Sequence, residues 1–270
     1  MTRKAIDTGT NTPDAVLAKE TGVDKTLYKG LLLVELLSKT RRAGVSELAA
    51  QTGLTKSNVH RLMQTLCRVG WVRKVEADSS YELSYRCWEV AQSWLSSFDM
   101  PRIAGPFLAD LAAETQETVH LGVLEGSDVT FVVTIDSPLP LRTYMRRGSR
   151  APAYCVATGK AILAFLPPEE APPLPDKLLS YAAGSLLNPE QIEAELQLTR
   201  ERGYATNRAE WQDQINGIAA PVYVGGGTSG SVIAAVGLSG PAERLNQAAI
   251  RRYAPKVKAA AAAIGKAIMS

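Results

Sequence analysis

Cysteine and histidine are scarce in this chain of 270 residues, which contains three cysteines and two histidines. The cysteines, Cys67, Cys87 and Cys155, are odd in number, far apart and never form a CxxC pair. A disulfide framework or a structural zinc site is therefore not expected. We expect the protein to need neither a metal ion nor a cofactor.

Long apolar runs are also missing. The longest one, Leu31–Leu37, is short and contains Glu35, whereas a helix that spans a bilayer needs about 20 apolar residues. Residues 1–24 are polar and lack the apolar core of a signal peptide, so they predict a flexible tail. We therefore expect a cytoplasmic protein without a membrane partner. Its 46% apolar and 21% charged residues are typical of a globular chain.

Positive charge is concentrated near the N-terminus. Residues 22–75 contain ten basic and only three acidic side chains, although the net charge of the whole chain is only +3. The remainder must then be slightly acidic. A basic small domain joined to a larger acidic one indicates that the first binds a polyanion. The alternative is a solvated basic surface.

The basic segment has the periodicity of helices. Leu27, Leu31, Val34 and Leu37 recur at i, i+4, i+7 and i+10, which predicts the inner face of a first helix from Lys25. This helix should end at residues 41–44.

Two more helices should follow. Ser46 is expected to cap a short second helix, which Gly53 stops. Thr55 is expected to cap a third helix from Lys56. Its apolar residues from Val59 to Val69 share one face, and its hydrogen-bond donors share another.

The donor-rich face of the third helix is suited to a DNA major groove, where Lys and Arg contact phosphate or guanine and Asn and Gln pair with adenine. Two short helices joined by a turn with glycine predict a helix-turn-helix. Residues 71–83 predict a β-hairpin, which we interpret as a wing with Ser79 near a phosphate, although Trp71 also suits a core. An ordinary three-helix bundle is the alternative. The predicted DNA contacts are Arg41, Arg42, Ser46, Thr55, Lys56, Ser57, Asn58, His60, Arg61, Gln64, Arg73 and Lys74.

The rest of the chain predicts an α+β domain. Residues 87–99 have the pattern of a linker helix, and residues 100–115 predict another helix. Strands are expected at 119–123, 129–135, 141–146, 218–224 and 231–239, with a turn at 125–128 between the first two. Helices are expected at 156–166, from Pro189 to Gly203, and at the C-terminus with an interruption near Pro255. The glycine run 225–230 predicts a hairpin turn.

The motifs resemble those of one family. The run VSELAAQTGLTKSNVHRLMQTL from Val45 is similar to the winged helix-turn-helix of the IclR family of bacterial transcription regulators. ETVHLGVLEG from Glu117, ATGKA from Ala157, RGYA from Arg202, GIAAPV from Gly217 and SGP from Ser239 resemble the second domain of that family. The resemblance covers about residues 25–268.

The resemblance implies a domain order and a function. The winged helix-turn-helix would occupy 25–86, the linker helix 87–99 and a GAF-like effector-binding domain 100–270. It also implies a dimer or a dimer-of-dimers tetramer, a pseudo-palindromic operator, and control by a small organic acid. RNA polymerase is a possible further partner. The family match implies a regulator and not an enzyme.

The family places its effector where Thr158-Gly159-Lys160 opens a helix. The motif also resembles a phosphate loop, but Tyr154 and Ala161 stand where the Walker spacing requires glycine and Ser or Thr. Free N–H groups at a helix start can hold a carboxylate instead. The positions that match the family's effector contacts are Ala157, Thr158, Asn207, Gly217, Gly237 and Ser239.

Departures from the family suggest which acid binds. An acid, a cysteine and a serine are usual where this chain has Asn207, Gly217 and Gly237, so the expected floor is smaller and less acidic. We therefore expect an aromatic carboxylate, anchored by the helix start and by Arg142 or Arg208. The residues near these motifs that complete the predicted effector site are Arg142, Tyr144, Tyr154, Gly159, Arg208 and Trp211. The alternative is that the rings are core residues and the arginines are solvated.

Other functions stay open on the sequence alone. The effector could be an aliphatic oxo- or hydroxy-acid. The chain could also be a small-molecule enzyme with an appended DNA-binding domain, or a sensor that acts only through protein partners. Cys155 and His120 could be a nucleophile and a base, but nothing in the sequence orients them, and His120 lies in an alternating strand.

Overall fold

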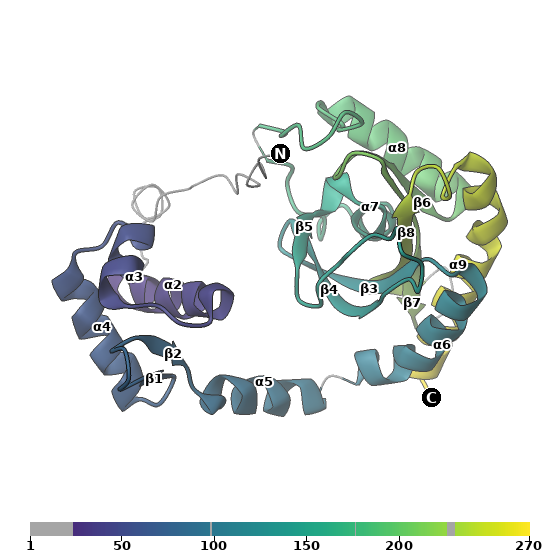
Figure 1. Cartoon of the computed structure of the whole chain (residues 1–270). Coiled ribbons are helices and arrows are strands. Elements are labelled where there is room, and N and C mark those ends of the chain that lie inside the picture. The colour runs from purple at the N-terminus through teal and green to yellow at the C-terminus, as the bar shows by residue number, and fades with distance from the viewer. Residues whose placement is uncertain (1–23, 98, 176, 226–229) are drawn as a thin grey trace. The chain divides into compact units, whose positions relative to one another are not determined.

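The computed structural model describes residues 24–97, 99–175, 177–225 and 230–270. The predicted flexible tail lies outside the described residues except for Asp24, and so does Phe98 near the predicted end of the linker helix. The chain divides between Ser97 and Phe98 into two units, each treated by itself below (Figure 1). No helix of the described residues has both the length and the apolar character needed to cross a bilayer.

The first unit is a winged helix-turn-helix (Figure 1). Its apolar core contains Leu33, Leu37, Leu48, Val59 and Met63, contributed by three helices. A two-stranded antiparallel hairpin follows them, and a further helix follows the hairpin. The elements are α2 (Lys25–Thr40), α3 (Val45–Thr52), α4 (Lys56–Arg68), β1 (Val72–Lys74), β2 (Tyr81–Leu83) and α5 (Tyr85–Ser97).

Most helix ends are where the sequence predicts them. The carboxylate of Asp24 accepts hydrogen bonds from the backbone N–H groups of Thr26 and Leu27 and so caps α2. Gly53 ends α3 in the left-handed region, with φ at 70°, and the Thr55 hydroxyl caps α4. The cap predicted at Ser46 is wrong. The backbone is already helical at Val45, so the N-cap position belongs to Gly44, which has no side chain to bond.

The inner face of α2 also differs from the prediction. Leu37 is buried as expected, but Leu27 is 64% and Leu31 is 54% exposed, and Leu33 takes the central place in the core. The run from Leu31 to Leu37 carries two apolar stripes, and periodicity alone does not say which one packs against α3 and α4. The second stripe is left at the surface.

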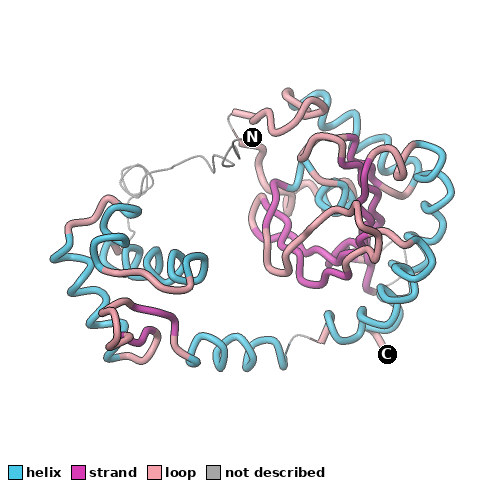
Figure 2. The backbone as a smooth tube through the Cα atoms, in the orientation of Figure 1, coloured by secondary structure: helices cyan, strands magenta, loops and turns pink. Residues whose placement is uncertain are grey.

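The second unit is one antiparallel sheet with helices on both faces (Figures 1 and 2). Strand order is β5-β4-β3-β8-β7-β6. Helices α6 and α9 pack on one face of the sheet, and α7 packs on the other. The strands are β3 (Thr118–Glu125), β4 (Asp128–Ile135), β5 (Arg150–Pro152), β6 (Ala205–Arg208), β7 (Ile215–Val224) and β8 (Ser231–Pro241). The helices are α6 (Met100–Thr115), η1 (Ala153–Cys155, a 3-10 turn), α7 (Ala157–Leu163), α8 (Pro189–Arg202) and α9 (Gln247–Ile268).

Two predicted elements of this unit need correction, and two strands were not predicted. Residues 141–146 are a loop and not a strand. Thr143 is buried and Met145 half-buried, but the backbone pairs with none of the described strands, and the carbonyl of Thr143 instead accepts a hydrogen bond from the side chain of Thr118. The neighbour of β4 is β5, and neither β5 nor β6 was predicted. Helix α9 continues through Pro255, whose ring removes a single backbone hydrogen bond from a helix of 22 residues.

Helix α7 lies close against the sheet because side chains are missing beneath it. A Cβ on Gly237 would lie 2.3 Å from Nε2 of His120 and 2.8 Å from Oγ1 of Thr158. A Cβ on Gly122 would lie 2.7 Å from Cγ2 of Thr158. Gly159 packs equally tightly against the backbone of Ala153, which a Cβ would approach to 2.2 Å. These glycines are therefore required by close helix–sheet packing.

We expect Gly237→Ala to destabilise the second unit by about 1–3 kcal/mol, because the new methyl overlaps His120 and Thr158 in a packed interior. The measurement is thermal unfolding, where this corresponds to a loss of about 2–4 °C per kcal/mol. Gly217→Ala is the matched control, since the atom nearest to its Cβ is Leu238 O at 3.2 Å. Equal melting temperatures for the two variants would contradict the packing argument.

Candidate DNA-binding surface and effector site

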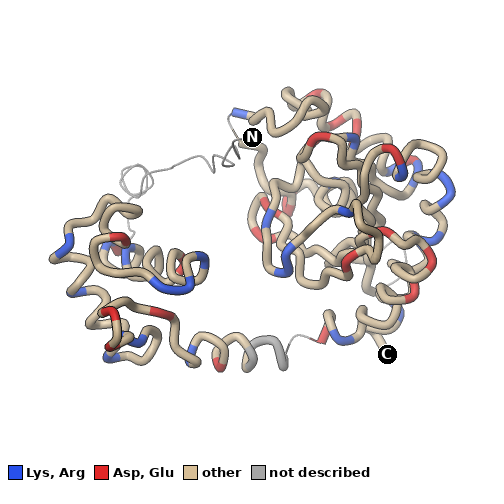
Figure 3. The backbone as a smooth tube through the Cα atoms, in the orientation of Figure 1, with Lys and Arg blue, Asp and Glu red and all other residues tan. Residues whose placement is uncertain are grey.

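The outer face of α4 is polar and free. Val59 and Met63 are fully buried on its inner side. The Thr55 hydroxyl accepts the N–H of Asn58, which fixes where the helix begins. Exposed side chains on this surface are those of Thr55, Lys56, Ser57, His60, Arg61 and Gln64, with Asn58 half-buried. Figure 3 shows basic residues along this unit. The helix can therefore present hydrogen-bond donors while its other side holds the core.

Two of the predicted DNA contacts share one carboxylate on the hairpin. Nε of Arg42 lies 2.6 Å and Nη2 of Arg73 lies 2.5 Å from the carboxylate of Glu82. The hydrogen bond from Arg42, supported by Arg73, lowers the pKa of Glu82. Both arginines remain more than half exposed. Glu82 thus orients two cations at the base of the wing.

The other predicted contacts of this region are at the surface. Arg41 follows α2 directly with φ at 66°, and Ser46 lies in the first turn of α3. Lys74 ends β1. All three are exposed, and none forms an ion pair with another described residue.

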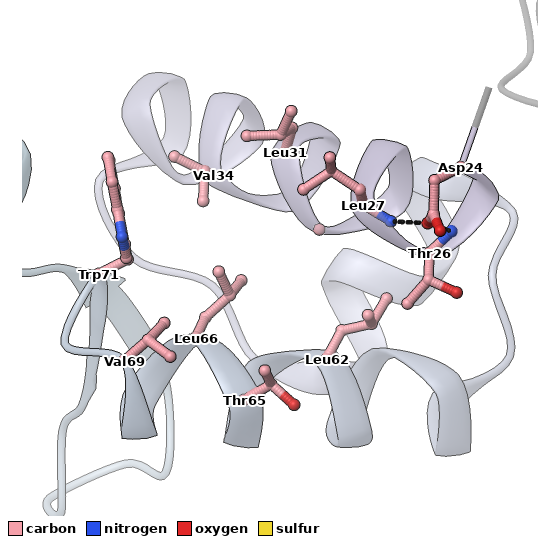
Figure 4. A pocket seen from close by; sticks show the side chains of 11 residues that line it. Asp24, Thr26, Leu27, Leu31, Val34, Leu62, Thr65, Leu66, Val69 and Trp71 are labelled. Carbon is pink, nitrogen blue, oxygen red and sulfur yellow. Dashed lines mark hydrogen bonds between the residues drawn. The ribbon is translucent and has the colours of Figure 1, made fainter.

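The exposed stripe of α2 forms one wall of an apolar groove (Figure 4). Leu27, Leu31 and Val34 of α2 face Leu62 and Leu66 of α4 across it. Val69 and Trp71 close one end, Asp24 and Thr26 line the other, and the volume is about 620 Å³. On a helical wheel of α4, the centre of the groove side is nearly half a turn from the centre of the polar face. The groove therefore stays open when that polar face is occupied.

The matched effector positions line up across the sheet. Asn207, Gly217, Ser239 and Thr118 are successive partners on β6, β7, β8 and β3. A second row, two residues along each strand and so on the same face, contains Gly237, His120 and Thr134, again as direct partners. Directly opposed residues of antiparallel strands point to the same face. The two rows therefore face the start of α7 together.

The second row contains a buried histidine. Nε2 of His120 lies 2.8 Å from the hydroxyl of Thr158, and its ring meets the edge of Phe131 with centroids 5.1 Å apart. Burial lowers the pKa of His120 to about 4, so the imidazole is neutral at pH 7. Its Nδ1 has no hydrogen-bond partner among the described residues.

Three further buried polar atoms share this lack of a partner within the described chain. They are the hydroxyls of Ser239, Thr134 and Thr143. Ser239 and Thr134 stand in the two rows, and the loop carrying Thr143 is held to Thr118 of the first row by a hydrogen bond of 2.8 Å. Buried polar atoms are normally satisfied, and each exception calls for an explanation such as a bound molecule. Four of them together form a polar cluster that can receive a polar ligand.

The start of α7 and the end of β6 border this cluster. A Cβ on Gly217 would lie 3.6 Å from the Cβ atoms of both Ala157 and Asn207, so these three positions adjoin. The Asn207 side-chain amide donates a hydrogen bond to the carbonyl of Cys155 and accepts one from the N–H of Glu210. Both ends of this amide are therefore bonded within the protein. Gly237, by contrast, opens no free space, because His120 and Thr158 fill it.

The remaining predicted effector residues are placed differently. Arg142, Tyr144 and Arg208 are exposed, and Arg142 donates to the carbonyl of Leu139. Tyr154 is buried in a neighbouring apolar cluster, where its hydroxyl accepts from the N–H of Leu179 and burial raises its pKa. Trp211 packs at the edge of that cluster against Tyr181, with ring centroids 4.5 Å apart.

The second unit contains a buried ion pair that was not predicted from the sequence. Lys160 is fully buried in α7, and its Nζ lies 2.7 and 2.5 Å from the two carboxylate oxygens of Glu210. Burial raises the pKa of Glu210 and the ammonium of Lys160 opposes that shift. The two residues are 50 positions apart, and no spacing rule in the sequence connects them.

Groups suited to metal binding or nucleophilic chemistry are not assembled in the described part of the chain. No cluster of three or more His, Cys, Asp or Glu side chains there could hold a metal ion. Burial raises the pKa of the Cys155 thiol to about 12, so at neutral pH it is protonated and a poor nucleophile.

Comparison with known proteins agrees with this architecture. Residues 26–76 match the family model described as the IclR helix-turn-helix domain, and residues 92–266 match the one described as bacterial transcriptional regulator IclR C-terminal. The HTH-type transcriptional regulator KdgR of Dickeya chrysanthemi is 28% identical over 92% of this chain and 81% of its own length.

Solved structures have the same fold. The IclR of Thermotoga maritima superposes with a TM-score of 0.71 at 27% identity, covering 89% of this chain and 97% of that one. An IclR homologue of Microbacterium hydrocarbonoxydans, solved as a complex with 4-hydroxybenzoate, has a TM-score of 0.74 at 23% identity, covering 90% and 99%. With both domains matched in order over most of its length, the chain belongs to the IclR family of DNA-binding transcriptional regulators.

Proposed function

We propose that α4 is the helix that reads DNA and that the hairpin is a wing beside it. The support is the combination of a free polar face on α4, a fully buried opposite face, and Glu82 holding Arg42 and Arg73 at the hairpin. In this proposal Arg61 and Gln64 contact base edges, and Lys56 near the helix start contacts phosphate. The protein would act in the bacterial cytoplasm, with RNA polymerase as a possible further partner.

Arg61→Ala should weaken operator binding by about 1–3 kcal/mol and relax base preference, whereas Lys56→Ala should weaken binding to all sequences and reduce the salt slope by about 1. The probe is an operator selected by the wild-type protein from random duplexes, and the measurement is a gel shift at several salt concentrations. Lys266→Ala is the control, because it removes one exposed positive charge on α9, outside the proposed DNA-binding surface. If neither α4 variant changed the affinity for the operator, the proposal that α4 reads DNA would be wrong.

The active form is, in this proposal, a homodimer on a pseudo-palindromic operator, alone or within a tetramer. The groove between α2 and α4 supports it, because Leu27, Leu31 and Val69 are each more than half exposed there. Exposed apolar patches of this kind mark protein–protein contacts. Tyr85 and Trp88 on the following α5 are also exposed. A dimer built here would leave the polar face of α4 free for DNA.

Leu31→Glu should raise the dimer dissociation constant about tenfold or more, because a leucine buried in an interface contributes roughly 1.5–3 kcal/mol. Sedimentation equilibrium of the full chain measures it. Leu198→Glu is the control, since Leu198 is 48% exposed on α8 of the other unit. If Leu31→Glu associates as tightly as the wild type and the control do, the groove is not the dimer contact.

The effector, we infer, binds at the polar cluster between the start of α7 and the sheet. The observation that carries this proposal is the group of four buried, unpartnered polar atoms on His120, Thr134, Thr143 and Ser239. They supply hydroxyls and a neutral imidazole, which suit a ligand that both donates and accepts hydrogen bonds. N–H groups at the start of α7 would hold its carboxylate, with Arg142 or Arg208 as a further anchor.

An aromatic acid is the proposed class of effector. The edge of Phe131 against His120 provides a ring-lined border to the cluster. Tyr154 and Trp211, in the adjoining apolar cluster, supply more aromatic surface on the same side of the sheet. The Microbacterium homologue was solved with 4-hydroxybenzoate, which makes that acid a reasonable probe. The alternative is an aliphatic oxo- or hydroxy-acid.

Calorimetry with benzoate, 4-hydroxybenzoate, pyruvate and glyoxylate distinguishes the two classes. We expect an aromatic acid to bind with a measurable heat. The Ser239→Ala variant should bind that acid about 2- to 12-fold more weakly, because it loses one hydrogen bond to the acid. Ser231→Ala, at the exposed start of the same strand, serves as the control. Binding of the aliphatic acids alone would overturn the aromatic assignment.

A further inference from the structure

The buried ion pair of Lys160 and Glu210 joins parts of the second unit that are distant in the sequence. Lys160 is on α7, and Glu210 follows β6. Besides Lys160, the Glu210 carboxylate accepts the backbone N–H of Arg208 at 3.1 Å. The Glu210 carbonyl accepts the hydroxyl of Ser185 at 2.8 Å. One side chain and its backbone thus connect a helix, a strand end and a loop.

The same connections lead to the border of the polar cluster. The N–H of Glu210 donates to Oδ1 of Asn207 at 2.9 Å, and Nδ2 of Asn207 donates to the carbonyl of Cys155 at 3.1 Å. Cys155 lies two residues before Ala157, where α7 begins. The chain of bonds therefore forms a closed loop: from Lys160 through Glu210 and Asn207 back to the start of α7.

Two more contacts tighten this loop. The N–H of Gly184 donates to the carbonyl of Ala209 at 3.0 Å, and a Cβ on Gly184 would come within 2.2 Å of the carbonyl of Arg208. Glu195 of α8 lies 4.0 Å from Nζ of Lys160 and also accepts the hydroxyl of Thr206. Several elements thus hold the turn after β6 in one place.

A buried ion pair is weak evidence for stability, because desolvation offsets the attraction of the two charges and an apolar pair of similar size often serves as well. Its directional bonds, however, fix geometry. We propose that Lys160 and Glu210 are positioning residues that set the distance between the start of α7 and Asn207, and with it the width of the effector site. This inference rests on the proposed effector site, which it deepens.

The test is native-state hydrogen exchange of the full chain with both charges removed together, in Lys160→Met/Glu210→Gln. The expected result is exchange about tenfold faster at the amides of 158–163 and 207–210, while the amides of α6 and α9 keep their wild-type rates. Removing both charges avoids leaving one buried charge unpaired. Glu210→Asp, which keeps the charge but shortens its reach, should give an intermediate increase at the same amides.

The matched control is the ion pair of Arg244 and Glu117 in the same unit, with N–O distances of 2.7 and 2.8 Å and Glu117 buried. Arg244→Met/Glu117→Gln should leave the amides of 158–163 and 207–210 unchanged. Unchanged exchange at these amides in the Lys160/Glu210 variant would overturn the proposal, and so would faster exchange spread evenly over the unit, which indicates a general stabiliser.

Thermal shift with benzoate, 4-hydroxybenzoate, pyruvate and glyoxylate separates this inference from the proposed function. If no acid shifts the melting temperature of the wild type, the proposed effector fails, while the exchange pattern still decides the role of the ion pair. An acid that shifts the wild type should give a shift at least halved in the double variant. An undiminished shift would contradict the positioning role.

Discussion

The close contact between α7 and the sheet is the constraint on which the candidate effector site depends. Gly122 and Gly237 leave room for Thr158, and Gly159 leaves room for the backbone of Ala153. Only with this approach does the hydroxyl of Thr158 reach His120. The same burial keeps His120 neutral. The floor beneath α7 is therefore polar but carries little charge, and the nearby charge of Lys160 is balanced by Glu210.

The first unit was largely predictable because its signals are local. Thr55 and Gly53 determine the ends of neighbouring helices through bonds to adjacent residues, and a sequence reader can see both. The face of α2 was not predictable in the same way. Its leucines form two stripes, and the choice between them depends on how α3 and α4 pack, which lies outside the segment itself. Leu27 and Leu31 were therefore expected inside and are found at the surface.

In the second unit the decisive contacts are far apart in the chain. The short strand β6, with sequence Ala-Thr-Asn-Arg, has no apolar alternation to reveal it, and residues 141–146 alternate without pairing. The effector positions were suggested by family resemblance, and only the strand register explains why they face one another. The partner of Lys160 could not be predicted from the spacing of residues in the sequence. Between Lys160 and Glu210 the chain passes through the rest of α7, a long loop, α8 and β6.

Gly217 differs from the other two glycines under α7. A methyl group at 217 would meet its nearest atom at 3.2 Å, whereas Gly122 and Gly237 would meet theirs at 2.6 and 2.3 Å. Position 217 also borders Ala157 and Asn207, at the edge of the polar cluster. A methyl group there requires the carbonyl of Leu238 to shift by only a few tenths of an ångström, so a single codon change can reshape this edge with little disturbance of the sheet.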